Sequence, residues 1–193
     1  SAILPMNRLN VYHFDLKTDN ILYKRSSLKI IDFGEIGIST KAEPIPPIGH
    51  RPIQFNIPFS NILFSDYMNS KINDYLNKTN KSGPELYEKL QEVIAVAYEP
   101  MQQTGQGHEL YLVKYILPGI LELIGSTIEP EELLKQLIVN YCTTAVYSFI
   151  DFKAKKFDKV RYFNEVYSKN VDIYGWIMCY VDFILRWQSP TGN

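Results

Sequence analysis

The stretch that decides the fold lies near the N-terminus and reads His13-Phe-Asp15-Leu-Lys17-Thr-Asp-Asn20-Ile-Leu22. It runs into two short apolar segments, residues 20–23 and 28–32, around a polar turn, a pattern typical of a β-hairpin. Asn20 begins the first segment and Asp32 ends the second. Pairing the strands brings both side chains to one edge, so the sequence predicts that Asn20 and Asp32 share a site.

The residue types around this hairpin suit phosphoryl transfer. That reaction needs a carboxylate to orient the attacking hydroxyl, a cation near the transferred group, and oxygen ligands for magnesium. Asp15 is the candidate carboxylate, and Lys17, two residues further along an extended loop, is the candidate cation. Asn20 and Asp32 offer one neutral and one charged oxygen, the kind of ligand that Mg2+ or Mn2+ prefers. We therefore predict a catalytic pair beside a metal site.

The combined pattern H-x-D-x-K-x-x-N, with D-F-G starting twelve positions after Asn20, resembles the catalytic-loop and metal-binding signatures of eukaryotic-type protein kinases. The resemblance implies a kinase-like C-terminal lobe, with ATP as co-substrate held through the metal at Asn20 and Asp32. Lysine at position 17 favours the protein-kinase branch, since small-molecule phosphotransferases of similar fold more often carry histidine there. His13, Phe33 and Gly34 are then expected to be architectural.

A second, weaker match is Asp172-Ile-Tyr-Gly175-Trp, which resembles the start of the long buried helix of that lobe. In the kinase family this aspartate caps the backbone of the catalytic loop, whereas the plain alternative is an ordinary helix N-cap. The interval of 140 positions from Asp32 to Asp172 is longer than in ordinary kinases, so a helical insertion is expected between them. The segment from Arg51 to Ser60 looks most like divergent kinase-like proteins of large DNA viruses.

These matches predict one domain, 1–193, of the α+β class and mainly α. Its parts are the catalytic loop and metal-binding turn, an activation and substrate segment, the helical insertion, and the long buried helix, at 1–42, 43–66, 67–169 and 170–193. Five prolines between residues 43 and 58 forbid regular helix in the second part.

Apolar periodicity predicts the helices of the later parts. One is expected at about 84–99, a second from Pro130 onward, and two more at about 159–168 and 173–187. The buried stripe of the second helix is expected to comprise Leu133, Leu134, Leu137, Ile138 and Tyr141. The charged run 153–159 is expected to be a solvated face, with a functional basic patch as the alternative.

The sequence departs from the kinase pattern in three places. Phe14 stands where regulated kinases have an arginine that binds a phosphorylated activation loop, so that switch is expected to be absent. The A-P-E signature is missing, and 56–60 is the nearest replacement. Only twelve residues precede His13, too few for a glycine-rich loop and the phosphate-binding lysine with its helix glutamate. The N-lobe is thus not present, and it or another chain is an expected partner.

The leading interpretation is the C-lobe of a Ser/Thr protein kinase, inactive as this isolated chain, whose protein substrate the sequence does not identify. Its main alternative is a pseudokinase or a structural interaction protein, for example of a virion, and a small-molecule kinase is a third. Retention of Asp15, Lys17, Asn20 and Asp32 favours the enzyme, because a structural protein has no need of all four.

Composition limits the surroundings of the protein. A formal net charge of -1 and a pI near 6.3 give no general reason to expect nucleic acid or an anionic membrane as partner. No signal peptide is visible, and no apolar run approaches the roughly 20 residues that span a bilayer. The two cysteines form no C-x-x-C pair and suit a reducing compartment. We expect an intracellular protein, in host cytoplasm or virion if it is viral.

Overall fold

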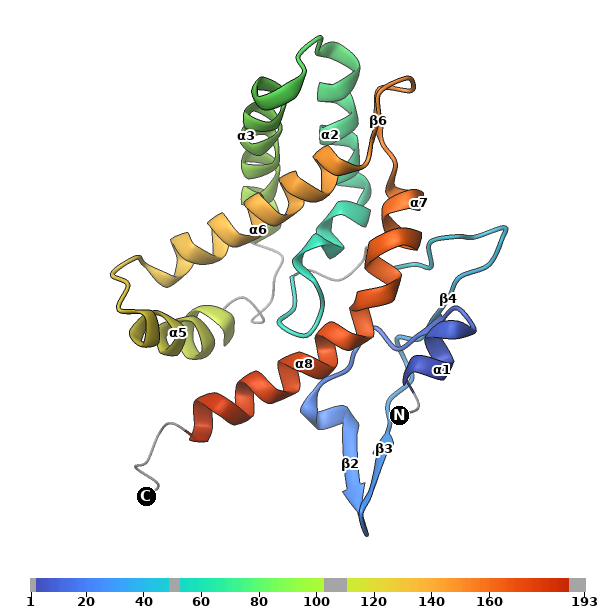
Figure 1. Cartoon of the computed structure of the whole chain (residues 1–193), viewed down its shortest axis with the longest axis vertical. Coiled ribbons are helices and arrows are strands. Elements are labelled where there is room, and N and C mark those ends of the chain that lie inside the picture. Colours follow the sequence, from blue (N-terminus) through green and yellow to red (C-terminus); the bar gives the residue numbers. More distant parts are fainter. Residues whose placement is uncertain (1–2, 49–52, 103–110, 188–193) are drawn as a thin grey trace.

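The structure, a computed structural model, describes residues 3–48, 53–102 and 111–187, with side chains as far as residue 181. Figure 1 shows a mainly helical α+β protein whose first part carries small sheets and whose remaining part is a group of helices. Within the described residues the strands form three two-stranded sheets. The expected α+β, mainly α class is confirmed. No helix among these residues is long and apolar enough to cross a membrane.

The first part of the chain positions the catalytic loop. Strand β1 pairs antiparallel with β4, and β2 pairs antiparallel with β3. The elements are α1 (Ile3–Arg8), β1 (Val11–Tyr12), the single 3-10 turn η1 (Thr18–Asn20), β2 (Ile21–Lys24), β3 (Ser27–Ile30) and β4 (Gly37–Ile38). The loop therefore leaves one small sheet at Tyr12 and enters the other at Ile21.

The predicted hairpin is present and tighter than expected. Ile21 lies opposite Ile30 and Lys24 opposite Ser27, so the turn consists of Arg25 and Ser26 alone. Both turn residues have positive φ, 48° and 64°, as a two-residue turn of the I′ type requires. The hairpin projects from the body (Figure 1), and its apolar residues Leu22, Tyr23 and Leu28 are exposed.

The middle of the chain is helical. Helices α2, α3 and α6 pack on one another and bury a continuous apolar core. The elements are η2 (Phe59–Phe64), α2 (Asp66–Lys78), α3 (Gly83–Gln102), the π-helical turn η3 (Leu112–Ile116), α5 (Leu117–Ile124) and α6 (Pro130–Ser148). Helix α3 extends three residues beyond the predicted end, because Pro100 removes only one hydrogen bond so close to the C-terminus.

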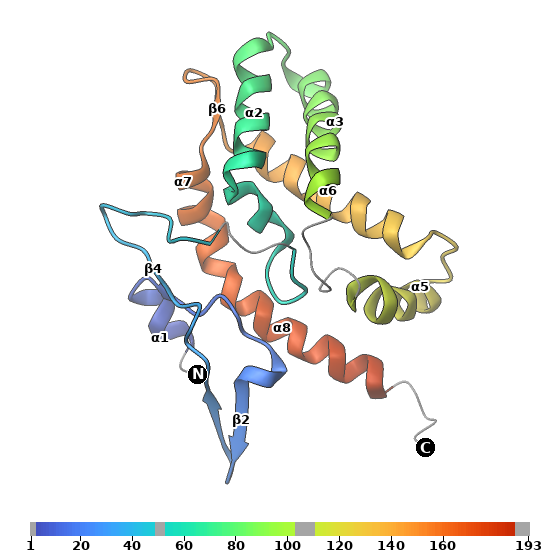
Figure 2. The ribbon, with the colours of Figure 1, turned by 180° about the vertical axis from the view of Figure 1, so that it is seen from behind.

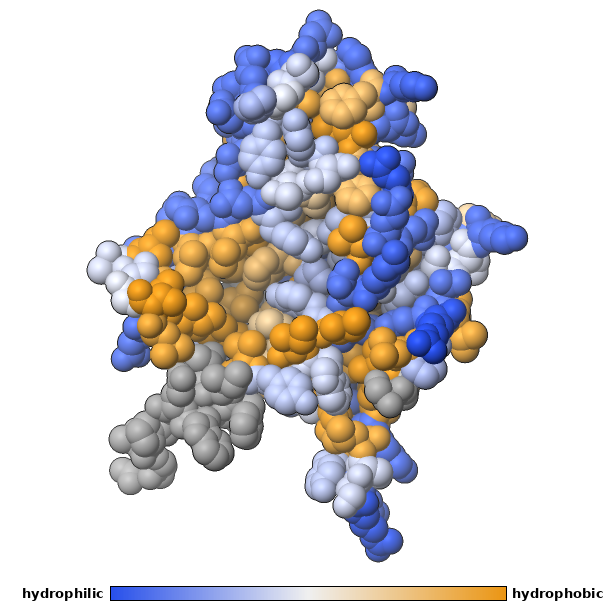
Figure 3. All heavy atoms as spheres, viewed as in Figure 1, coloured by the Kyte–Doolittle hydropathy of each residue, from blue (hydrophilic) through white to orange (hydrophobic). Residues whose placement is uncertain are grey.

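The predicted buried stripe of α6 is wrong in part. Leu137 and Tyr141 are exposed, whereas Leu134 and Ile138 are buried together with Cys142 and Val146. Those four follow one i, i+4 row, which faces α3 and η2. Leu123 and Ile124 of α5 are exposed as well, and the side of the molecule where α5 lies is visibly hydrophobic in Figure 3.

The C-terminal part begins with a hairpin that the sequence did not predict, β5 (Ile150–Asp151) with β6 (Lys156–Phe157). Three helical pieces then follow without a break, α7 (Lys159–Tyr162), the π-helical turn η4 (Phe163–Tyr167) and α8 (Ser168–Trp187). The prediction of two separate helices is wrong, because no proline or glycine separates them. Asp172 consequently lies inside α8, and the N-cap alternative for it is wrong as well.

Aromatic side chains join this long helix to the rest of the core. Phe64 of η2 lies with its ring centroid 4.7 Å from that of Tyr167, and Phe163 packs edge-on against Tyr12 of β1. The Tyr162 hydroxyl donates to Ser60 Oγ at 2.6 Å. Figures 1 and 2, seen from opposite sides, both show α8 running between the first part of the chain and the other helices. The helix is therefore placed to support the catalytic loop.

Candidate active site

The catalytic loop is anchored to α8 through Asp172, whose side chain is buried. The backbone N–H of His13 donates to both carboxylate oxygens at 3.1 and 3.0 Å, and that of Phe14 donates to Oδ1 at 3.0 Å. Asn7 of α1 adds a third donor group, its Nδ2, at 2.7 Å. These hydrogen bonds satisfy a buried carboxylate without a cation, which makes Asp172 a fixed support for the loop. The structure thus contains the contact that the resemblance implies for Asp172.

Phe14 is held in a strained conformation at the centre of this support. Its φ of 59° is uncommon for a bulky residue. Its ring stacks on Tyr12, with centroids 5.6 Å apart, and covers Gly37, where an added Cβ would lie only 2.2 Å from the ring. Phe14 is buried and serves packing, so it offers no phosphate-binding cation.

His13 connects the catalytic loop to the metal-binding turn. Its Nδ1 faces the backbone N–H of Asp15 at 3.3 Å, and its Nε2 lies 3.1 Å from the carbonyl oxygen of Ile31. Because Nδ1 must accept and Nε2 must donate, these partners select the neutral Nε2–H tautomer. The ring is buried and packs on Phe33, with centroids 5.1 Å apart. Both residues therefore lie where an architectural role requires them.

Asp15 receives hydrogen bonds at both carboxylate oxygens. Lys17 Nζ lies 2.9 Å from Oδ2 and Asn20 Nδ2 lies 3.1 Å from the same oxygen, while Asn56 Nδ2 donates to Oδ1 at 3.0 Å. Asn20 also donates to the backbone oxygen of Asp15 at 2.8 Å. Since Asp15 is only 4% exposed, these donors fix the direction of its carboxylate.

Asn56 is a site residue that the sequence reasoning missed. Its Nδ2 contacts two acceptors, Asp15 Oδ1 and the Leu16 carbonyl at 3.2 Å, so the orientation of its amide is determined. Its Oδ1 is buried and has no hydrogen-bond partner among the residues that the structure describes. The sequence contains one indication of this role, a polar side chain between the apolar residues Phe55 and Ile57. An amide at such a position is expected to be buried, and buried amides form specific hydrogen bonds. Arg51 and Pro52, which precede this segment, lie outside the described residues.

A close approach between α8 and the loop depends on Gly175. A Cβ added there would lie 2.7 Å from the Leu16 carbonyl oxygen and 3.0 Å from that of Asn56. Only glycine leaves room for both backbones. The loop, the segment that carries Asn56 and the helix thus meet at one point.

Asn20 and Asp32 both lie at the open end of the hairpin, on the two chain segments that strand pairing brings side by side. The backbone N–H of Ile31 donates to the Asn20 carbonyl at 2.9 Å, which places Asp32 one residue beyond the pair. Asp32 is exposed and has a φ of 60°, and its Oδ1 receives only a long bond of 3.4 Å from the Gly34 N–H.

The donor set fits a magnesium ion that is shared with a ligand. Asn20 uses its Nδ2 for Asp15, which leaves Oδ1 for a metal, and Asp32 offers an exposed carboxylate. Among the residues described, no group of three or more His, Cys, Asp or Glu side chains is arranged to hold a metal ion. Two protein oxygens are few for Mg2+, so the remaining ligands would be water and phosphate oxygens.

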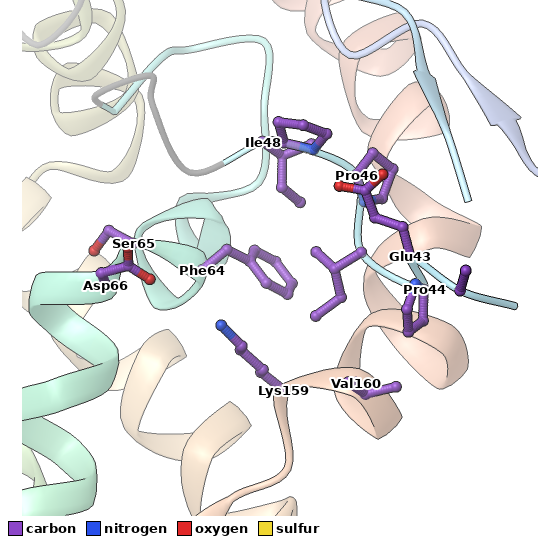
Figure 4. Close-up of a pocket in the computed structure, with 12 residues that line it drawn as sticks. Glu43, Pro44, Pro46, Ile48, Phe64, Ser65, Asp66, Lys159 and Val160 are labelled. Atoms are coloured by element: carbon purple, nitrogen blue, oxygen red, sulfur yellow. The ribbon is translucent and has the colours of Figure 1, made fainter. Parts of the chain in front are cut away.

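The described residues also form two hollows of about 400 Å3 or more. Figure 4 shows one, of about 420 Å3, between the proline-rich residues 43–48, Phe64 and the start of α7, with the Lys159 amine pointing into it. The other, of about 400 Å3, lies between the β2–β3 hairpin and α8, and its lining is mostly apolar. It is lined by Thr18, Ile21, Leu28, Trp176, Cys179 and Tyr180.

Comparison with known proteins gave no relative: no family model matches the chain, and neither a curated protein nor a solved structure matches it.

Proposed function

We propose that this chain is the C-terminal lobe of a protein-kinase-like Ser/Thr phosphotransferase, which transfers the γ-phosphate of ATP to a protein hydroxyl. One observation carries the proposal. Asp15, the candidate catalytic carboxylate, is buried and oriented by Lys17, Asn20 and Asn56, in a loop whose backbone is fixed by Asp172. Rigid placement of a carboxylate in this way is what orienting a hydroxyl nucleophile requires.

Each polar group then has a role in the transfer. Asp15 accepts a hydrogen bond from the attacking hydroxyl and takes up its proton. Lys17, 2.9 Å from Asp15 and partly exposed, neutralises charge on the transferred phosphoryl group. Asn56 is a positioning residue, because its only described side-chain donor bonds go to Asp15 and the Leu16 carbonyl.

Asn20 and Asp32 would hold the Mg2+ or Mn2+ that accompanies ATP. The bound ion supplies positive charge beside the β- and γ-phosphates. The chain itself holds the Asn20 amide through its bonds to Asp15 and places Asp32 shortly after the end of β3.

The nucleotide requires a covering surface, which we assign to an N-lobe or to another chain. The apolar hollow between the hairpin and α8 supports this assignment, as do the exposed side chains of Leu28, which lines it, and of Tyr23, opposite Leu28 on the same face of the hairpin. Exposed apolar residues that gather around a hollow mark a binding surface rather than ordinary solvent contact. The hollow of Figure 4 is lined in part by the expected substrate segment, residues 43–66. It is a candidate binding site for part of the protein substrate.

The test is phosphoryl transfer by the full-length gene product to a generic Ser/Thr substrate. Asp15→Asn should lower the rate by about two orders of magnitude or more while ATP affinity stays nearly unchanged, because the residue acts on the acceptor hydroxyl. Asp19→Asn, at an exposed position of the same loop, is the matched control. Equal rates for wild type and Asp15→Asn would refute the proposal.

A second candidate is a partner-binding protein on the same scaffold, a pseudokinase or structural protein. The observation that favours it is the exposure of four large apolar side chains on the adjacent helices α5 and α6, Leu123, Ile124, Leu137 and Tyr141, which the phosphoryl-transfer proposal does not use. The partner-binding function would be favoured if the wild-type protein showed no transfer activity and a partner protected these residues from solvent.

A further inference from the structure

The hairpin formed by β5 and β6 carries a concentration of positive charge. Residues 150–161 contain five basic and two acidic side chains, in a protein whose formal net charge is -1. The neighbouring turn between α2 and α3 adds Lys78 and Lys81. In Figure 3 this upper end of the molecule is mostly hydrophilic, with hydrophobic atoms showing among the hydrophilic ones. The charge is therefore local and is not a property of the whole surface.

A pocket of about 230 Å3 lies in the middle of this charge. Its floor is apolar, since Leu76, Leu86 and Ile150 are buried core residues. Its rim carries the amines of Lys81 and Lys155, and Phe152 forms a wall that is 65% exposed. An apolar floor within a cationic rim suits an apolar side chain that is flanked by negative charges.

The Lys81 amine is ion-paired with Glu85, whereas the lysines of the hairpin tip have no carboxylate partner among the described residues. Lys155 Nζ lies 3.5 Å from the Thr79 carbonyl and 3.4 Å from Asn80 Oδ1, both neutral acceptors. The Asp151 carboxylate accepts the backbone N–H groups of Ala154 and Lys153, which lower its pKa and commit it to the turn. Among the described residues, no salt bridge joins Lys153, Lys155 or Lys156 to a carboxylate.

The tip is also held in a fixed shape. Ile150 pairs with Phe157 and Asp151 with Lys156, and the Phe157 N–H donates to Asn73 Oδ1 of α2 at 2.9 Å. A preformed site loses less conformational entropy when a ligand binds.

We propose that this surface docks an acidic peptide segment of a partner protein, which inserts one apolar or aromatic side chain into the pocket beside Phe152. The concave shape of the pocket favours a peptide over other anionic partners. A bilayer surface does not fill a pocket of this size, and the phosphates of a nucleic acid gain nothing from the floor formed by Leu76 and Leu86. This docking site is independent of the phosphoryl-transfer proposal, because it uses none of the residues of that site.

The experiment measures fluorescence anisotropy of a labelled peptide, Glu-Asp-Trp-Glu-Asp, titrated with the 193-residue chain. Reversing two rim charges, Lys81→Glu with Lys155→Glu, should weaken binding about tenfold or more, and Phe152→Ser should weaken it about fivefold. Raising NaCl from about 50 to about 300 mM should weaken it further. The matched control reverses Lys24 of β2 and Lys169 of α8, which do not line the pocket, and should leave the affinity within about twofold.

Circular dichroism of each variant establishes that it is folded; all four substitutions of the rim and the control are at partly or fully exposed lysines. Equal loss of affinity in the rim and control variants would overturn the proposal, since it would show a non-specific charge effect. Equal affinity for a peptide with glycine in place of tryptophan would also overturn the proposal. So would a chain that binds no peptide but co-sediments with phosphatidylserine vesicles, if Phe152→Ser abolishes that co-sedimentation.

Discussion

The two halves of the candidate site differ in how firmly the protein holds them. Asp15 is 4% exposed and receives side-chain hydrogen bonds from Lys17, Asn20 and Asn56. Asp32, twelve positions beyond Asn20, is exposed and receives one long bond, from the Gly34 N–H at 3.4 Å. The candidate catalytic carboxylate is thus fixed by the chain, whereas the proposed metal ligand is exposed at the open end of the hairpin.

The contrast follows from what lies beneath each half. The catalytic loop rests on α8, through the Asp172 carboxylate and the close approach at Gly175. The hairpin has solvent on both faces beyond Ile21 and Ile30. A region with few buried contacts is expected to open at low free-energy cost, so the metal-binding half should gain order when nucleotide and a covering surface bind.

The largest expected effect is a loss of folding stability at alkaline pH, which arises from tyrosines of the long C-terminal helix that anchors the catalytic loop. Burial raises the pKa of Tyr162 and of Tyr167 far above its usual range, and raises that of Tyr174 to about 12. In the unfolded chain these hydroxyls ionise near pH 10, so only the unfolded state loses protons above that pH. Stability should therefore be complete below pH 10 and fall by up to about 4 kcal/mol per pH unit between pH 10 and 12.

Urea unfolding followed by far-UV circular dichroism at a series of pH values measures this slope. Tyr162→Phe should reduce it by about a third, because one of these three hydroxyls no longer ionises in the unfolded chain. A slope that does not respond to that substitution would contradict the assignment.

The next effect breaks the anchor itself. Asp172→Ala leaves the N–H groups of His13 and Phe14 without their acceptor and removes one of the two hydrogen bonds of the Asn7 amide, and should cost about 3–5 kcal/mol of unfolding free energy. Amide exchange should accelerate most in the catalytic loop. Asp74→Ala, at an exposed position of α2, is the control and should change stability by less than about 0.5 kcal/mol. Similar losses in both variants would show that the loop does not depend on Asp172.

The smallest effect compares two leucines on either side of Asn20. Leu16 is 1% exposed and Leu22 is 51% exposed. Leu16→Ala should cost about 2–5 kcal/mol, whereas Leu22→Ala should cost less than about 0.5 kcal/mol because its side chain contacts little. Denaturant midpoints of the two variants measure the difference. A large loss for Leu22→Ala would mean that the hairpin is part of the core.

The sequence was sufficient for the hairpin and for the placement of Asn20 and Asp32 at its open end, because strand pairing is local and its register follows from a short turn. It could not predict Asn56 as a partner of Asp15, since that contact spans 41 positions and depends on how the proline-rich segment returns. The single long helix formed by α7, η4 and α8 was also missed. Its apolar residues serve two neighbours, the aromatic core and the loop, so no single stripe marks its length.

Metal binding tests the central claim most directly, because the claim is that a fixed Asp15 and an exposed Asp32 are two halves of one phosphoryl-transfer site. The measurement is a titration of the nitrogen-15-labelled chain with Mn2+ in the presence of ADP, followed by paramagnetic broadening of amide signals. We predict that the signals of Asn20, Asp32 and Phe33 broaden first, and that Asp32→Ala removes this broadening while the catalytic-loop signals keep their shifts. Broadening that begins at other acidic residues, such as Glu131 and Glu132 at the start of α6, and that persists in Asp32→Ala would contradict the account.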